Sequence, residues 1–158
     1  MTPKQVKYDS DTDGRGVLIQ RQPIQQFTHD VFHRMGMSEE DASVMGEVLT
    51  AANLRGQDSH GVHLIPRYTQ AIRDGYMNAQ PNVQIVKETP ACLVVDADLA
   101  FGHTVSTWAM NKAMEKAKQV GIGYVLLKRT THQGAMYYYP LMAAQNDMLG
   151  FAWVATQP

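Results

Sequence analysis

The sequence has little of what several protein classes require. Cys92 is the one cysteine among 158 residues, which excludes an internal disulfide and is typical of the reducing cytosol. No apolar run approaches the roughly 20 residues that span a bilayer, and residues 1–16 lack the apolar core of a signal peptide. A net charge of −1 does not indicate a nucleic-acid or membrane-surface partner. We therefore expect a cytoplasmic protein that binds neither nucleic acid nor membranes.

Two kinds of ligand-binding motif are also missing. There is no Gly-x-Gly-x-x-Gly run and no Walker run, so neither a Rossmann dinucleotide site nor a P-loop is supported. His60 and His63 have the i, i+3 spacing of a metal-binding pair, but third and fourth ligands at usable spacing are not evident. We predict no metal site. A metal-dependent lyase or hydrolase that uses His60, His63 and His132 is kept as an alternative.

What the sequence does contain is typical of a globular protein. Apolar residues make up 44% of the chain and charged residues 18%, enough for a real core. We predict a flexible tail over residues 1–16 and a helical segment over 17–80. Residues 81–158 are predicted to be the first part of an α/β domain that is truncated at its C-terminus.

The helical segment is predicted from capping residues and periodicity. After a short strand at 17–20, Pro23 suits the first turn of a helix that stops at Gly36 and buries Ile24, Phe27, Val31 and Met35. The run Ser38-Glu39-Glu40-Asp41 is typical of a capping box with an acidic first turn. It predicts a second helix that ends at Gly56 and buries Ala42, Met45, Val48, Leu49 and Ala52.

The period changes after residue 82. We predict strands over 83–88, 91–96, 122–128 and 149–156, and helices over 104–120 and 134–147. Strands that alternate with helices indicate α/β layers with parallel pairing. Ligand sites in such sheets lie beyond the carboxyl ends of the strands, and the chain stops where the last predicted strand ends. This is why we expect a truncated domain.

The first candidate site is the stretch from Gly56 to Tyr68. Asp58 and Ser59 are good N-cap residues, so a third helix is predicted from Ser59 to Gly75, with a kink or break at Pro66. His60 would then lie in the first turn, where the helix dipole binds anions and lowers an imidazole pKa. The stretch is therefore interpreted as a proton acceptor beside an anion site. A histidine in a capped first turn is also common without any function.

The second candidate site follows the predicted strand 122–128. A buried strand that ends in a His-x-Gly turn places His132 at the ligand edge of the sheet. Gly134 and Ala135 would let a flat ring or a phosphate approach the backbone closely. In the alternative structural interpretation, His132 caps the next helix and the tyrosines after it pack in the core.

The two sites together resemble one protein family. The run Ala52-Asn53-Leu54-Arg55-Gly56-Gln57-Asp58-Ser59-His60-Gly61-Val62, with Pro66-Arg67-Tyr68 after it, resembles the Ser-His-Gly signature of the malate/L-lactate dehydrogenase family. This family is unrelated to the Rossmann-fold lactate dehydrogenases. It includes ureidoglycolate dehydrogenase, sulfolactate dehydrogenase and diketogulonate reductase. The similarity continues through Gly102 and His132-Gln133-Gly134-Ala135, so it implies the N-terminal half of a sulfolactate-dehydrogenase-like α/β fold.

The resemblance implies an oxidoreductase. It would transfer hydride between NAD or NADP and C2 of a small 2-hydroxy or 2-oxo acid such as malate, lactate or ureidoglycolate, and would work as a homodimer. One of two catalytic histidines, His60 and His132, would move the hydroxyl proton. The resemblance also implies substrate contacts by Ser59, Arg67, Tyr68 and Thr156, and cofactor contacts by His132, Gly134 and Ala135.

The chain departs from the family pattern in three places. Leu64 stands where many members have an arginine that grips the substrate carboxylate, and Arg67 lies one turn further on. Thr131 replaces the Asn or Gly often found before the second histidine. Family members are also considerably longer. A second hypothesis is therefore an inactive dimerisation or interaction module derived from a dehydrogenase.

Overall fold

The computed structural model describes residues 19–155. The predicted tail over 1–16, the first two residues of the predicted strand 17–20 and the predicted substrate residue Thr156 lie outside the described residues. Ile19 and Gln20 are not in a strand. Gln20 instead precedes the first helix, where its carbonyl accepts from the N–H of Ile24.

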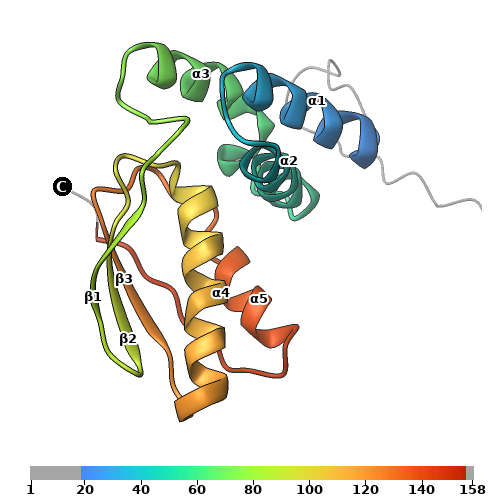
Figure 1. Ribbon diagram of the computed structural model, residues 1–158. Coiled ribbons are helices and arrows are strands. Elements are labelled where there is room, and N and C mark those ends of the chain that lie inside the picture. Colours follow the sequence, from blue (N-terminus) through green and yellow to red (C-terminus); the bar gives the residue numbers. More distant parts are fainter. Residues whose placement is uncertain (1–18, 156–158) are drawn as a thin grey trace, which may run out of the picture.

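Helices precede a small sheet, as predicted for an α/β fold (Figure 1). The first part contains α1 (Arg21–Arg34), α2 (Glu39–Leu54), the 3₁₀ turns η1 (Asp58–His60) and η2 (Val62–Leu64), and α3 (Ile65–Arg73). The second part contains β1 (Gln84–Glu88), β2 (Cys92–Asp96), α4 (Gly102–Val120), β3 (Tyr124–Lys128) and α5 (Tyr138–Ala144). Within the described residues, no helix is long and apolar enough to cross a membrane.

The sheet confirms the predicted parallel pairing. Its strand order is β1-β2-β3; β1 pairs with β2 antiparallel, and β2 pairs with β3 parallel, with α4 as the crossover. The parallel register joins Cys92 to Tyr124 and Asp96 to Lys128, so β2 and β3 end at the same edge. The segments that follow them therefore leave the sheet side by side, which brings the start of α4 close to residues 130–134.

The α2 prediction is confirmed in detail. The Ser38 hydroxyl accepts a hydrogen bond of 3.1 Å from the N–H of Asp41, and three acidic residues occupy the first turn. All five residues predicted to face inward are buried. The α1 face was predicted wrongly at one position, since Phe27 is 54% exposed. The fully buried positions of α1 are Thr28 and Phe32, whereas Ile24, Val31 and Met35 of the predicted stripe are half-buried.

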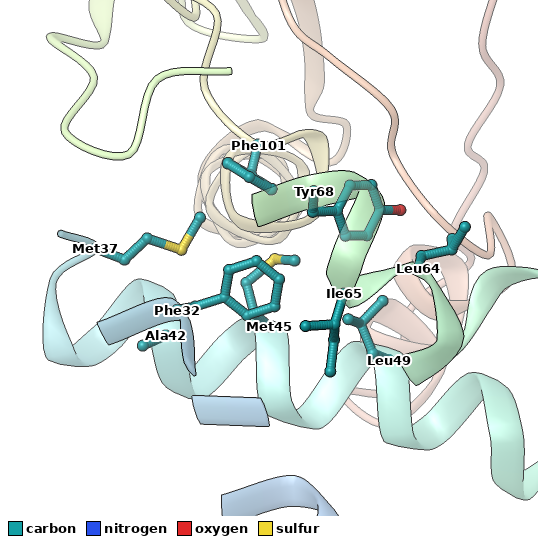
Figure 2. Close-up of a cluster of buried hydrophobic side chains, with 9 residues drawn as sticks. All are labelled: Phe32, Met37, Ala42, Met45, Leu49, Leu64, Ile65, Tyr68 and Phe101. Atoms are coloured by element: carbon teal, nitrogen blue, oxygen red, sulfur yellow. The ribbon is translucent and has the colours of Figure 1, made fainter. Parts of the chain in front are cut away.

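A cluster of buried side chains joins the helices (Figure 2). Tyr68 of α3 packs edge-on against Phe101, with ring centroids 5.7 Å apart, and Phe32 of α1 packs edge-on against the same ring. Burying each such ring contributes about 1.5–3 kcal/mol to folding. The cluster thereby anchors α3, which carries Tyr68, against the residue that precedes α4.

Two helices differ from their predicted limits. The predicted helix over 59–75 is divided into η1, η2 and α3, and Pro66 lies in the first turn of α3 rather than at a kink. A proline there loses no hydrogen bond, because first-turn N–H groups have no helical partner. The helix predicted over 134–147 is only α5, and the Tyr139 hydroxyl donates to the carbonyl of Gln133. That bond folds the preceding coil back onto the helix.

The strand predicted over 149–156 is wrong for its described part. Residues 149–155 form no strand, and Leu149, Phe151 and Trp153 are 92%, 74% and 68% exposed. A strand forms only where a second strand pairs with its backbone groups, and an apolar run alone does not supply that partner. The predicted burial of two other strands is also wrong. All five residues of β1, predicted as half-exposed, are exposed, and β3, predicted as buried, has only exposed and half-buried residues.

An ion-pair network ties together the carboxyl ends of β2 and β3. Arg129, at a positive φ of 53°, donates from Nε to Asp96 over 2.8 Å and from Nη2 to Asp98 over 3.0 Å. The other oxygen of Asp98 accepts from Asn78 and from the N–H of Asn82. The network fixes the loops that lead into α4 and toward His132.

We expect this network to make stability depend on pH in acid. The Arg129 guanidinium, then the N–H of Asp98, lower the pKa of Asp96 to about 2, whereas an unfolded aspartate titrates near pH ~4. Between those values the unfolded chain takes up a proton and the folded chain does not, so the free energy of unfolding falls. In urea unfolding, the midpoint difference between the wild type and Asp96→Asn should be present at pH 5 and smaller at pH 3. An equal difference at both values would contradict this role.

Candidate active site

The Ser59-His60-Gly61 turn is held in place by one side chain of α2. The amide of Asn53 donates to the carboxylate of Asp58, and its oxygen accepts from the N–H of Val62 over 2.9 Å. A Cβ at Gly61 would overlap the same amide group. Glycine is therefore required because the Asn53 side chain fills the space beside it, and the turn presents His60 in a defined position.

The helix dipole predicted to create an anion site at His60 is not found there. Neither η1 nor α3 has a side-chain cap, so the predicted N-cap roles of Asp58 and Ser59 are wrong. His60 ends η1, and α3 begins five residues later at Ile65. The dipole of a long helix consequently does not start at this imidazole. The Ser59 hydroxyl instead lies 3.0 Å from Nδ1 of His60.

The structure brings the two predicted histidines together. The rings of His60 and His132 stack with centroids 5.5 Å apart and 25° between their planes. The two residues are 72 positions apart in the sequence. His132 follows β3, and the shared edge at which β2 and β3 end places it near His60. The prediction that His132 lies at this edge of the sheet is therefore confirmed. His132 is exposed and His60 is half-buried, so both rings are accessible to a small molecule.

Tyr68 lies behind this pair. Its ring belongs to the buried cluster (Figure 2). Its hydroxyl lies 2.7 Å from Nδ1 of His132. The residue is 1% exposed, and burial raises the pKa of its hydroxyl. The hydroxyl therefore keeps its proton at neutral pH and fixes the orientation of the His132 ring.

The surroundings of His132 keep it neutral. Burial of part of the ring, then the positive charges of His60 and Arg67, lower the pKa of His132 below its ordinary value. A neutral imidazole at pH 7 has one nitrogen free to accept a proton. The pair is thus suited to proton transfer at one accessible ring nitrogen of His132.

The remaining predicted residues have different positions. Arg67 is exposed, and its charge reaches His132. Leu64 is buried in the helical cluster and Gly134 and Ala135 are buried too, with Gly134 at a positive φ of 70°. The space that a Gly134 side chain would fill is occupied by the ring of His103, 2.5 Å from the hypothetical Cβ. The cofactor contacts predicted for Gly134 and Ala135 stay predictions.

Sequence reasoning missed His103. It lies in the first turn of α4, is 0% exposed, and its Nε2 lies 3.3 Å from the Tyr68 hydroxyl. The available signal was one imidazole inside the apolar run Leu99-Ala100-Phe101-Gly102-His103. A buried polar ring requires a partner, but the sequence does not say that the partner is Tyr68, 35 residues away.

A metal site is not assembled from these histidines. Within residues 19–155, no group of three or more histidine, cysteine, aspartate or glutamate side chains is placed to hold a metal ion. His63 is exposed on η2 and is not part of the stacked pair. A hollow of about 580 Å³ lies elsewhere, between the α1–α2 turn and α4, and neither His60 nor His132 lines it.

Known proteins are similar to this chain in sequence and fold. L-sulfolactate dehydrogenase of Methanocaldococcus jannaschii is 40% identical over 129 residues, which are 82% of this chain and 38% of that protein. Malate dehydrogenase of Pyrococcus abyssi is 37% identical, with 92% of this chain and 40% of that protein covered. The solved structure of the M. jannaschii enzyme superposes with a TM-score of 0.81 at 37% identity, covering 83% of this chain and 38% of that one.

The chain therefore spans about 40% of the length of the relatives that it matches. The structural match confirms the predicted sulfolactate-dehydrogenase-like fold. The profile of one family, described as malate/L-lactate dehydrogenase, matches residues 19–158 and so includes both histidines and the tyrosine between them. This chain belongs to the malate/L-lactate dehydrogenase family.

Proposed function

We propose that this chain carries the proton-transfer part of an NAD- or NADP-dependent oxidoreductase that acts on a small 2-hydroxy or 2-oxo acid. The observation that carries the proposal is the 2.7 Å contact between Tyr68 and Nδ1 of His132, with His60 stacked on the same ring. It holds one accessible imidazole nitrogen beside a second imidazole. The two relatives named above are dehydrogenases of 2-hydroxy acids by name, which supports the substrate class.

The chemistry requires such a group. Hydride can leave C2 of a hydroxy acid only if the hydroxyl proton is removed, and the best acceptor has a pKa near the working pH. His132 can act as this acceptor, because its lowered pKa leaves the ring neutral at pH 7 and Tyr68 orientates it. His60 stacks on the His132 ring, close enough to contact the same small substrate.

The substrate carboxylate would bind next to these histidines. Arg67 supplies the positive charge that acts on His132, and the Ser59 hydroxyl lies beside His60, so both can contact a small anion there. Leu64 is buried and does not take part. Tyr68 reaches the site through its hydroxyl, and Thr156 is proposed from the resemblance alone.

We place the nicotinamide ring beside His132 rather than against Gly134 and Ala135, on the basis of their exposure. His132 is accessible, whereas Gly134 and Ala135 are buried and lie against His103 and the core. The cofactor, when bound, supplies or accepts the hydride. The residues of this chain orientate the acid and move its proton. We also propose, on the resemblance, that the working protein is a homodimer.

A titration of the purified chain with NADH and NADPH, read by nicotinamide fluorescence, tests the proposal. It should be done with and without oxaloacetate, sulfopyruvate and pyruvate. We expect saturable binding of one dinucleotide and its oxidation with one acid. His63→Ala is a matched control, because His63 is exposed and outside the stacked pair. A folded chain that binds neither dinucleotide would contradict the proposal for this chain.

A second candidate function is a non-catalytic interaction module. It is favoured by the exposed apolar side chains of residues 149–155 and by the exposed Tyr124 and Leu126 on β3, the strand at one end of the described sheet. Exposed apolar surface of this kind is typical of protein–protein contacts. A folded dimer without dinucleotide binding would favour this function.

A further inference from the structure

Three side chains form a line that runs from the exposed His132 of the candidate active site to the buried Tyr68 and His103. The hydroxyl oxygen of Tyr68 lies 2.7 Å from Nδ1 of His132 and 3.3 Å from Nε2 of His103. The other nitrogen of His103, Nδ1, is buried and has no hydrogen-bond partner among the described residues. Among the described residues, the hydrogen bonding of the His103 ring therefore goes to one atom, the Tyr68 oxygen.

The ring of His103 is held in place by the backbone. Gly134 lies against it at a positive φ of 70°, and a Cβ there would approach Nε2 to 2.5 Å. The T-shaped contact with the Tyr68 ring has a centroid distance of 5.3 Å. The imidazole is thus kept at the tyrosine hydroxyl with no room to turn away.

The hydroxyl between the two histidines has only one proton to give. If Tyr68 donates it to His103, its oxygen accepts from Nδ1–H of His132, and Nε2 of His132 is left free. If Tyr68 donates to His132, the proton of the neutral His132 ring is on Nε2. Whether Tyr68 donates to His103 or to His132 therefore decides whether the accessible nitrogen of His132 accepts or donates a proton.

Only one direction is compatible with proton uptake by His132. Once Nε2 has taken a proton, both ring nitrogens carry hydrogen, and Nδ1–H needs an acceptor. The Tyr68 oxygen serves only if its own proton points at a bare nitrogen, and Nε2 of His103 is the one within reach. If Tyr68 instead donated to His132 and accepted from Nε2–H of His103, the N–H groups of both histidines would point at the Tyr68 oxygen once His132 is protonated. Nδ1 of His103 lacks a partner in either order.

We propose that His103 is a positioning residue that accepts the Tyr68 proton, so that Tyr68 accepts from Nδ1 of His132 and leaves Nε2 of His132 as the proton acceptor. This inference rests on the proposed role of His132 in proton transfer. The state of His103 suits the task. Burial, then the charges of His132 and His60, lower its pKa to about 3, so its ring stays neutral and keeps a bare nitrogen.

The test is nitrogen NMR of the chain with isotope-labelled histidine, which needs neither cofactor nor substrate. The groups that face His132 are His60 on η1, Arg67 and Tyr68 on α3, and His103 on α4. In the wild type we expect a protonated Nδ1 on His132, and on His103 a protonated Nδ1 with a bare Nε2. A bare Nδ1 on neutral His132 would overturn the proposal without any variant.

Variants separate positioning from packing. His103→Leu should turn the Tyr68 proton toward His132, making Nδ1 of His132 bare and lowering its pKa by about half to one unit. His103→Gln, whose carbonyl can accept the same proton, should retain the protonated Nδ1. His103→Leu combined with Tyr68→Phe should change His132 no more than Tyr68→Phe alone.

Each failure has a separate meaning. A folded His103→Leu chain with an unchanged His132 would overturn the positioning role. If His103→Leu does not fold, the wild-type protonation pattern alone decides the proposal. Failure of the dinucleotide titration would contradict the proposed function and leave the NMR result standing as a statement about His132 itself.

Discussion

Replacement of His132 by alanine should lower the turnover of 2-oxo acid reduction by about 10²–10⁴-fold, with little change in substrate affinity. The loss is expected because the accessible nitrogen of His132 moves the proton at the reacting oxygen, an interaction that matters most in the transition state. The measurement is steady-state kinetics with the dinucleotide and acid found by titration, in this chain or in a longer protein that contains it.

The controls for His132 distinguish its role from that of its neighbours. His63→Ala should leave turnover unchanged, since this exposed side chain is outside the pair. His60→Ala shows which ring moves the proton: a smaller loss in turnover than for His132→Ala assigns the transfer to His132. An increase in KM at constant kcat for His132→Ala would instead show that His132 only binds the substrate.

The pH dependence of activity should also reflect proton transfer by His132. In the oxidation direction the proton acceptor must be neutral, so activity rises with pH through the pKa of His132. Burial and the neighbouring charges lower that pKa, so the rise should occur below pH ~6.5, the ordinary value for histidine.

Replacement of Gly123 by alanine should reduce the free energy of unfolding by about 3 kcal/mol or more. Gly123 lies between α4 and β3, and a Cβ on it would overlap the backbone carbonyl of Ala113 in α4. A backbone atom cannot rotate away, so the helix or the strand must move. For a chain of this size the midpoint of thermal unfolding should fall by about 6–12 °C.

Gly121 is the matched control for this change. It lies two residues away at a positive φ of 87°, and no atom lies within 4 Å of its hypothetical Cβ. Gly121→Ala should therefore cost only about 1 kcal/mol, the strain of a left-handed conformation. Equal losses for the two variants, by circular dichroism melting, would contradict the steric explanation.

Predictions from capping residues, periodicity and element order were correct for elements that depend on neighbouring residues. The cap and buried face of α2 depend on Ser38 and on residues three or four apart, and both were predicted correctly. Helix α4 ends at Gly121 as predicted, because a left-handed residue closes a helix. The parallel pairing of β2 and β3 followed from the order strand, helix, strand.

Predictions failed where a residue far away in the sequence determines the burial or the backbone conformation. Phe27 is exposed because the orientation of α1 depends on the face that α2 offers, and residues 149–155 form no strand because an apolar run does not create a neighbouring strand. The turns η1 and η2 replace one long helix because Asn53 takes up the N–H of Val62. A side chain nine positions away overrides the local capping pattern.

The family signature, the α/β class and both candidate histidines can be identified from the amino-acid sequence alone. Those properties depend on residue type, order and short spacing. The stacking of His60 on His132, the contact of Tyr68 with His132 and the place of His103 beside the Tyr68 hydroxyl are known only from the folded chain. These contacts span 35 to 72 residues and exist because parallel strands end at one edge of the sheet, a geometry that no local pattern contains.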